Sequence, residues 1–206
     1  VTTILDMPFN TTPPTSTPEL LQAKRDVVEN KSVVDYGHWA GLEPDNLDAL
    51  KELHEGGVTA YKAFMCDPGI DFGQVDAFSL YEGMERIARW GNVVGVHAEN
   101  ASLVEGFAQR LKEKGRKDPL AWAESRPPVA ELEALNRAIL VAEEASVDLH
   151  LLHVTIPEGF GANGRARARG IPVTAETCPH YLALDHEDLA RLGPVAKCGP
   201  PLRSRE

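Results

Sequence analysis

The order of the apolar segments constrains the fold more than any other feature of this sequence. Six β-rich runs are separated by stretches with the spacing of amphipathic helices, so strands and helices alternate along the chain. The runs are VTTILDM (1–7), SVVDYGHWA (32–40), VTAYKAFM (58–65), NVVGVHAE (92–99), VDLHLLHVT (147–155) and IPVTAETC (171–178). Most are nearly continuous in apolar residues, which is typical of parallel strands covered on both faces.

The stretches between the runs carry helix signals. Thr17 is placed to cap a helix whose first residue is Pro18. The longest stretch, 129–145, puts an apolar stripe on one face, at the spacing of a helix that lies on a sheet. That stripe consists of Leu132, Leu135, Ile139 and Ala142. The stretch 157–170 carries three interior glycines, at about 1 kcal/mol each against alanine, so we expect a short or irregular helix there.

Strands that alternate with helices fit either a doubly wound sheet or part of a (β/α)8 barrel. No G-x-G-x-x-G follows the first run, and no G-x-x-x-x-G-K-[ST] occurs in the sequence. These absences favour the barrel. The composition does not change along the chain, so we expect residues 1–206 to form a single α/β domain, a partial (β/α)8 TIM-type barrel.

Composition excludes several classes of partner. The formal net charge of −10, from 21 Lys and Arg against 31 Asp and Glu, leaves no broad basic surface for nucleic acid. No apolar stretch approaches the roughly 18 residues of a membrane helix, and the first residues lack the order of a signal peptide. The three cysteines are far apart and form no C-x-x-C pair. We therefore expect no nucleic acid, no membrane, reduced thiols and a cytoplasmic location.

One charge falls where an apolar strand is expected. Lys62 lies inside GGVTAYKAFM, and an unpaired ammonium in a core is costly enough that the group loses its proton or finds a partner. In barrels and open α/β sheets, functional side chains gather at the carboxyl ends of the strands. That rule selects Lys62, then His97 with Glu99, and then His153 with Thr155. His153 is a better candidate than His150, because it is nearer the carboxyl end of its run.

Each of these residues also has an ordinary structural interpretation. A histidine at a strand end is more often a satisfied core residue than a metal ligand, and a strand lysine more often extends along an edge into solvent. However, Lys62, His97 and His153 come from three consecutive strands, and a metal centre would explain all three. A neutral lysine amine can add carbon dioxide to give a carbamate, whose two oxygens could bridge a pair of cations.

Several segments, taken in order, resemble the cyclic amidohydrolases, the family of allantoinase, dihydropyrimidinase (hydantoinase) and dihydroorotase. The segments are VTTILDMPFNTTPPT, GGVTAYKAFM, VVGVHAEN, LHLLHVT, VTAETCPHYL and KCGPPLR. The resemblance implies two divalent metal ions, zinc first, with manganese, cobalt and iron as alternatives, bridged by a carboxylated lysine. By motif, that lysine is Lys62, and two metal-binding histidines are His97 and His153. The resemblance makes Asn10 and the backbone of Gly199 candidates to hold the substrate ring.

The sequence departs from the family pattern at both ends. The first barrel strand of the family ends in a His-x-His metal pair, and the eighth ends in an aspartate that binds metal and carries a proton. Neither feature is present here. We therefore expect the chain to correspond roughly to barrel strands 2 to 7 and to be inactive by itself.

A single position separates members of the family. Hydantoinases place a tyrosine five residues after the lysine, and this sequence has Asp67 there. The loops CDPGIDF and DYGHWAGL are similar to allantoinase, so the resemblance implies a small cyclic ureide substrate and hydrolysis of allantoin to allantoate in purine catabolism. The alternatives are hydantoinase or dihydroorotase activity, a structural relative without catalysis, and an inactive fragment. The family also implies a homo-oligomer, a dimer or a tetramer.

For several other polar residues we expect structural roles. We expect His54 on the solvent side of a helix and His186 at a helix start. His180 and Cys178 are expected to shape the turn after the last run, and His38 could line the pocket. Arg203 could bind either a substrate oxygen or a neighbouring carboxylate.

Overall fold

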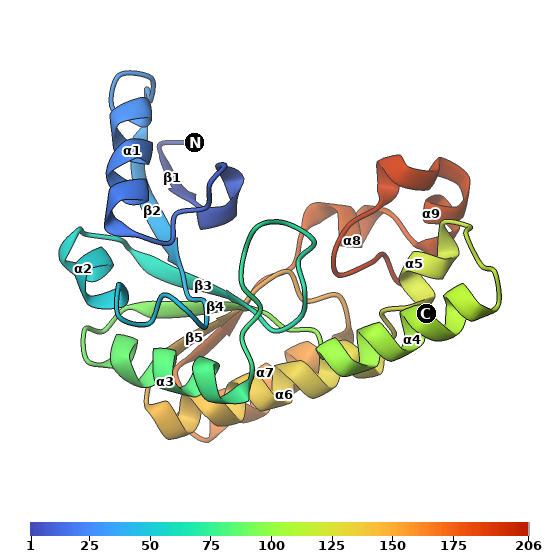
Figure 1. The fold of residues 1–206 in the computed structure, drawn as a ribbon. Coiled ribbons are helices and arrows are strands. Elements are labelled where there is room, and N and C mark those ends of the chain that lie inside the picture. Colours follow the sequence, from blue (N-terminus) through green and yellow to red (C-terminus); the bar gives the residue numbers. More distant parts are fainter. Residues whose placement is uncertain (206) are drawn as a thin grey trace. The chain divides into compact units, whose positions relative to one another are not determined.

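The computed structural model describes residues 1–205, apart from the side chain of Asn10. Each of the six apolar runs coincides in large part with one strand, and the strands hydrogen-bond in sequence order (Figure 1). They are β1 (Thr3–Asp6), β2 (Asp35–Gly41), β3 (Ala60–Phe64), β4 (Val93–His97), β5 (Asp148–Leu151) and β6 (Val173–Ala175). The predicted α/β fold, a partial TIM-type barrel, is confirmed.

Helices follow most of the strands. The α-helices are α1 (Pro18–Val28), α2 (Leu50–Glu55), α3 (Ala77–Ala88), α4 (Ala101–Glu113), α5 (Leu120–Glu124), α6 (Pro128–Ala145), α7 (Pro157–Ala168), α8 (Pro179–Ala183) and α9 (His186–Leu192). Two short 3-10 helices are η1 (Pro8–Asn10) and η2 (Gly193–Ala196). The expected cap is present, since the Thr17 side chain accepts a hydrogen bond from the Leu20 N–H with Pro18 at the first helical position.

The chain divides into two compact units. The first comprises Val1–His97 with Leu140–His150, and the second comprises Ala98–Ile139 with Leu151–Glu206. The prediction of a single domain stays a prediction, and each unit is described by itself.

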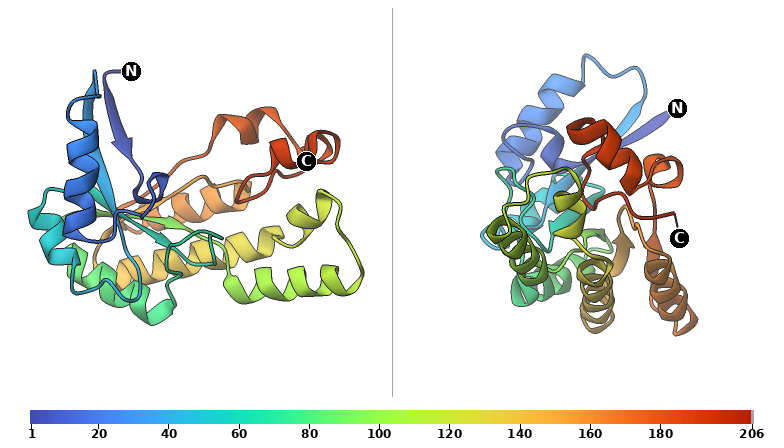
Figure 2. Two further views of the ribbon diagram at one scale, coloured as in Figure 1. Left: turned by 45° about the horizontal axis from the view of Figure 1, so that its top comes forward. Right: turned by 90° about the vertical axis from the view of Figure 1, so that its right-hand side faces the viewer.

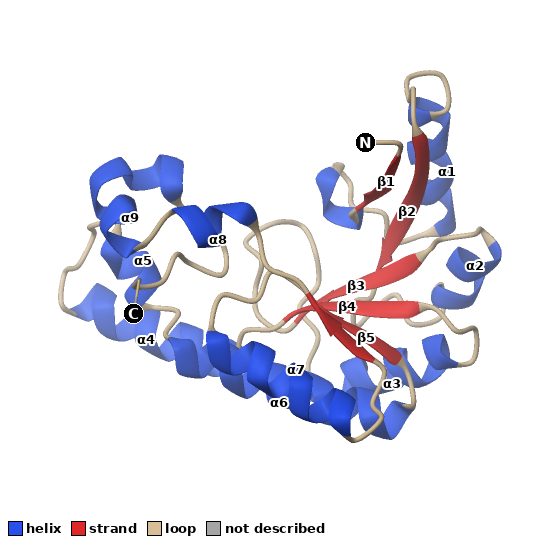
Figure 3. Cartoon of the chain, turned by 180° about the vertical axis from the view of Figure 1, so that it is seen from behind, coloured by secondary structure: helices blue, strands red, loops and turns tan. Residues whose placement is uncertain are grey.

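In the first unit, β1 to β4 form consecutive parallel pairs (Figure 3). All five residues of β3 are buried, as its continuous apolar pattern predicts. The helix α1 lies alongside β2 (Figure 2). The helix α3 begins with a capping box between Asp76 and Ser79, and its Gly83 allows close contact with Leu42, which is fully buried.

The second unit has a small core that is formed by α9 and the chain segment that follows it. Leu189, Ala196 and Leu202 are buried together, and Trp122 of α5 and Tyr181 of α8 pack against them. Asp185 caps α9 with a second capping box, so His186 is the first residue of a helix, as expected. This packing ties α5 to α9, which lie near each other in Figure 1.

The expectation for α7 is wrong. A regular helix of 12 residues replaces the short or irregular one, despite its glycines. Gly159, Ala162 and Ala166 are buried on one side, and a Cβ on Gly159 would meet Val154 at 2.6 Å and Leu135 at 2.8 Å. The small residues therefore permit close packing, which outweighs the low helix propensity of the glycines.

The described residues also give findings on membrane helices and on cysteine pairing. No helix among them is long and apolar enough to cross a membrane. Cys66, Cys178 and Cys198 are free thiols, and Cys66 is buried.

Candidate metal centre

Lys62 and His97 project from the same face of the sheet in the first unit. In the parallel register of β3 and β4, Lys62 pairs with Gly95 and Phe64 pairs with His97. Side chains alternate along a strand and register partners face the same way, so Lys62, Phe64 and His97 share a face. Lys62 is 1% exposed and His97 is 5% exposed. The structure thus places these two predicted residues on one buried face of the sheet.

Two aromatic rings lie near the Lys62 amine. Its Nζ lies 4.5 Å from the ring centroid of Phe64 and 5.9 Å from that of Phe9. The Phe64 ring in turn lies 5.0 Å from the His97 ring, centroid to centroid. Ring faces attract a cation, and the rings also keep water from the amine. The apolar pattern of the run predicted the burial of Lys62, whereas the contribution of Phe9 was not foreseen.

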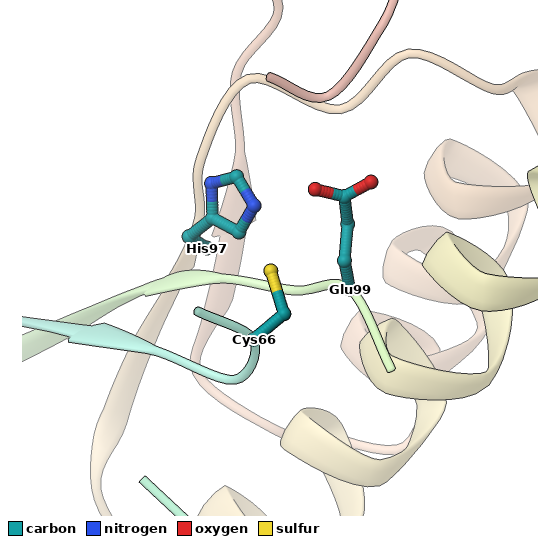
Figure 4. A group of neighbouring side chains, drawn as sticks. All are labelled: Cys66, His97 and Glu99. Atoms are coloured by element: carbon teal, nitrogen blue, oxygen red, sulfur yellow. The ribbon is translucent and has the colours of Figure 1, made fainter. Parts of the chain in front are cut away.

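Cys66 adds a sulfur donor to this face. A ligand atom of its side chain and one of the His97 ring lie within 4.8 Å of each other, and Cys66 is 1% exposed (Figure 4). Figure 4 also labels Glu99, which follows His97 by two residues and belongs to the second unit. The sequence predicts only a reduced thiol at Cys66. The available signal was its position two residues after the end of β3, at the carboxyl end of that strand.

His153 lies in the second unit, two residues beyond the end of β5, so it is not a strand residue. Its φ is +42°, in the left-handed region that non-glycine residues rarely adopt. Hydrogen bonds fix the next two residues. The Val154 N–H donates to the Glu176 carbonyl at 2.8 Å, and the Thr155 N–H donates to Glu131 Oε1 at 2.7 Å. Whether His153 joins Lys62 and His97 stays a prediction.

Two buried carboxylates in the second unit pair with arginines. Glu99 is fully buried and accepts a hydrogen bond from Arg126 Nη1 at 2.6 Å. Glu131 is 1% exposed and accepts one from Arg203 Nη2 at 2.7 Å. Of the two roles left open for Arg203, the structure gives the neighbouring carboxylate. Glu131 was not singled out from the sequence, where it resembles any acidic residue of an amphipathic helix.

The two candidate substrate residues lie in different units. Asn10 ends η1, and its side chain lies outside the described part of the structure. Gly199 lies between two anchored carbonyls, since Trp122 Nε1 donates to the Cys198 carbonyl and the Tyr181 hydroxyl donates to the Pro200 carbonyl, both at 2.7 Å. Burial raises the pKa of the Tyr181 hydroxyl, so it stays protonated and can donate. Both substrate roles stay predictions.

The donors on the β3–β4 face fit a metal ion. An imidazole and a thiol within reach of one another suit zinc and neighbouring transition metals. Lys62 is buried on the same face, with its amine over the Phe64 ring. Its carboxylation stays a prediction.

Comparison with known proteins finds relatives that match the whole of this chain. It is 42% identical over 206 residues to a protein named allantoinase from Solibacter usitatus, and 44% identical to another from Rubrobacter xylanophilus. Each match covers 100% of this chain and 45% of the relative. No family model matches the chain. The chain is thus similar over its whole length to proteins named allantoinase, as its motifs predict.

Solved structures agree with this similarity. The L-hydantoinase (dihydropyrimidinase) from Arthrobacter aurescens superposes with a TM-score of 0.95 at 35% identity, over 100% of this chain and 46% of that protein. The chain therefore spans about half the length of the relatives it matches. Asp67, at the position where the resemblance implies a tyrosine in hydantoinases, is exposed and accepts a hydrogen bond from the Gly69 N–H at 2.8 Å.

Proposed function

We propose that this chain takes part in the metal-dependent hydrolysis of a cyclic amide C–N bond, with allantoin as substrate and allantoate as product. The observation that carries the proposal is the buried face shared by Lys62 and His97, in a chain 42–44% identical to proteins named allantoinase. Fold likeness alone would not suffice, because one barrel fold hosts many reactions.

The proposed cofactors are two divalent metal ions, zinc first, with manganese, cobalt or iron as alternatives. When bound, such ions supply an activated water and a polarised substrate carbonyl. Lys62 would hold them through a carbamate formed with carbon dioxide, and His97 and His153 would each offer a ring nitrogen. The rings of Phe9 and Phe64 would exclude bulk water from the Lys62 amine.

Substrate binding is assigned to the two loops named from the sequence. The backbone of Gly199 is the candidate to hold the ureide ring, and the anchored carbonyls of Cys198 and Pro200 on either side support that role. Asn10, in η1, is the second candidate.

We further propose that the active enzyme includes barrel strands beyond the six described here. The sequence contains no His-x-His pair, and the matched relatives are about twice as long as this chain. On this view, residues 1–206 are the central part of the barrel and contribute three of six metal ligands, so this part alone does not catalyse.

A hydantoinase activity is the second candidate, because the L-hydantoinase from Arthrobacter aurescens superposes at a TM-score of 0.95. Asp67 argues against it, since an exposed carboxylate that accepts from its own turn replaces the tyrosine of hydantoinases. A non-catalytic structural relative would be expected to lack metal ligands, whereas Lys62, His97 and His153 are all present.

The test is an assay of hydrolysis with added zinc or manganese on three substrates: allantoin, a hydantoin and dihydroorotate. It compares the purified chain, an enzyme with the missing strands supplied, and the Lys62→Ala variant of that enzyme. We expect allantoin turnover by the longer enzyme alone. Turnover by the purified chain would overturn the proposal that further strands are needed, and turnover by Lys62→Ala would overturn the bridging role.

The cellular setting is also proposed. Three free cysteines fit a reducing compartment, so we assign the protein to the cytoplasm and to purine catabolism. A homo-oligomer, a dimer or a tetramer, is the proposed assembly of the enzyme.

A further inference from the structure

The loop that carries His153 has a backbone conformation that needs support. A non-glycine residue at a φ of +42° costs free energy and persists only where its surroundings fix it. Among the described residues, His153 and Ser146 are the two non-glycine residues at positive φ. Ser146 lies in the turn after α6, whereas His153 is a candidate metal ligand.

Glu131, on the first turns of α6, fixes this loop from one side. Its Oε1 accepts from the Thr155 N–H at 2.7 Å, and its Oε2 accepts from the Thr155 hydroxyl. The carboxylate thus accepts hydrogen bonds from both the backbone and the side chain of Thr155, two positions after His153. Bonds of this kind to an ionised, buried carboxylate are stronger than bonds between neutral groups.

Arg203 completes the same cluster from the segment KCGPPLR. Its Nη2 donates to Glu131 Oε2 at 2.7 Å, its Nε donates to the Thr155 hydroxyl at 2.9 Å, and its Nη1 donates to the Arg126 carbonyl. Glu131 is 1% exposed and the Arg203 side chain is 14% exposed. One buried ion pair therefore joins the loop of His153 to the segment that contains Gly199.

We propose that Glu131, paired with Arg203, is a positioning residue that holds His153 in its left-handed conformation and so presents the imidazole to the metal. This inference rests on the proposed function, because it takes His153 as a ligand. Glu131 acts through Thr155 and touches neither metal nor substrate. Removing a group that orients a metal ligand, without touching the metal itself, typically weakens metal binding 10–100-fold.

The decisive variant is Glu131→Gln, which keeps the shape of the side chain. A neutral amide has one acceptor oxygen and cannot take the three donors that Glu131 accepts. We expect the Thr155 amide to exchange with solvent at least about tenfold faster, and Co²⁺ to bind about tenfold more weakly with a changed visible spectrum. Unchanged exchange together with an unchanged Co²⁺ spectrum would overturn the proposal.

Two further comparisons separate positioning from general destabilisation. Thr155→Val removes the hydroxyl but keeps the N–H, so it should weaken Co²⁺ binding in the same direction, while Thr155→Ser should restore it. The control is Glu133→Gln on the same helix, where the carboxylate pairs with Arg137 at 3.1 Å and is 41% exposed. An equal loss in Glu133→Gln, or no rescue by Thr155→Ser, would contradict the specific role of Glu131.

Failure of the proposed function would show itself differently. In that case His153→Ala would leave Co²⁺ affinity and spectrum unchanged, and the metal role of His153 would fall. Exchange of the Thr155 amide in Glu131→Gln needs no metal, so it would still decide whether Glu131 fixes the loop.

Discussion

His38 is a buried histidine on β2 whose two ring nitrogens have no hydrogen-bond partner among the described residues. Burial, and then the charge of Lys24, lower the pKa of His38, while Asp6 opposes them. The folded protein therefore keeps this ring neutral at a pH where the unfolded chain, with a histidine pKa of about 6.5, is already protonated.

The pH dependence of stability follows from this difference. Below about pH 7 the unfolded state takes up more protons than the folded state, so the free energy of unfolding falls as pH falls toward the lowered pKa of His38. His38→Gln should flatten this slope in urea titrations between pH 7 and 5. His180→Gln, at an exposed histidine, is the control. An equal slope in wild type and His38→Gln would contradict the buried, neutral state of His38.

At the scale of elements, the effect of replacing an interior helix glycine depends on which atoms a new Cβ would contact. A Cβ on Gly83 of α3 would meet Leu42 Cδ1 at 2.2 Å, whereas a Cβ on Gly106 of α4 would meet nothing within 4 Å. Alanine gains about 1 kcal/mol of helix propensity at either site, but overpacking a core costs roughly 1–3 kcal/mol.

The two substitutions should therefore have opposite signs. Gly106→Ala should raise the free energy of unfolding by up to about 1 kcal/mol. Gly83→Ala should lower it, because Leu42 is fully buried and cannot move aside freely. Denaturant unfolding measures both. If Gly83→Ala proves as stabilising as Gly106→Ala, the close packing of α3 on Leu42 is wrong.

Local patterns in the sequence predicted the strands, most helices and the burial of Lys62, because these depend on periodicity and capping. The regular α7 was missed, because propensity is a local quantity while the packing of Gly159 against Leu135 joins distant segments. For the same reason, Glu131 and Arg203, which are 72 residues apart, could not be paired from the sequence.

At the scale of the whole molecule, β1 is the terminal strand in the sheet order and is poorly covered. Ile4 and Leu5 are 48% and 56% exposed, and Tyr36 on the neighbouring β2 is 38% exposed. An exposed, apolar edge strand can pair with another chain.

We expect the purified chain to associate as its concentration rises, and Leu5→Lys to shift it toward monomer, since a charged edge residue opposes pairing. Sedimentation velocity over a range of concentrations measures this. A wild-type chain that stays monomeric throughout would contradict the expected association through β1.

The carboxylation of Lys62 decides whether the buried face of β3 and β4 is a metal centre of the proposed kind. It is tested most directly by carbon-13 NMR of the zinc-loaded protein in ¹³C-bicarbonate, beside its Lys62→Ala variant. We expect a carbamate carbonyl signal in the wild type that is absent from Lys62→Ala. No such signal in the wild type, or the same signal in both proteins, would contradict the bridging role of Lys62.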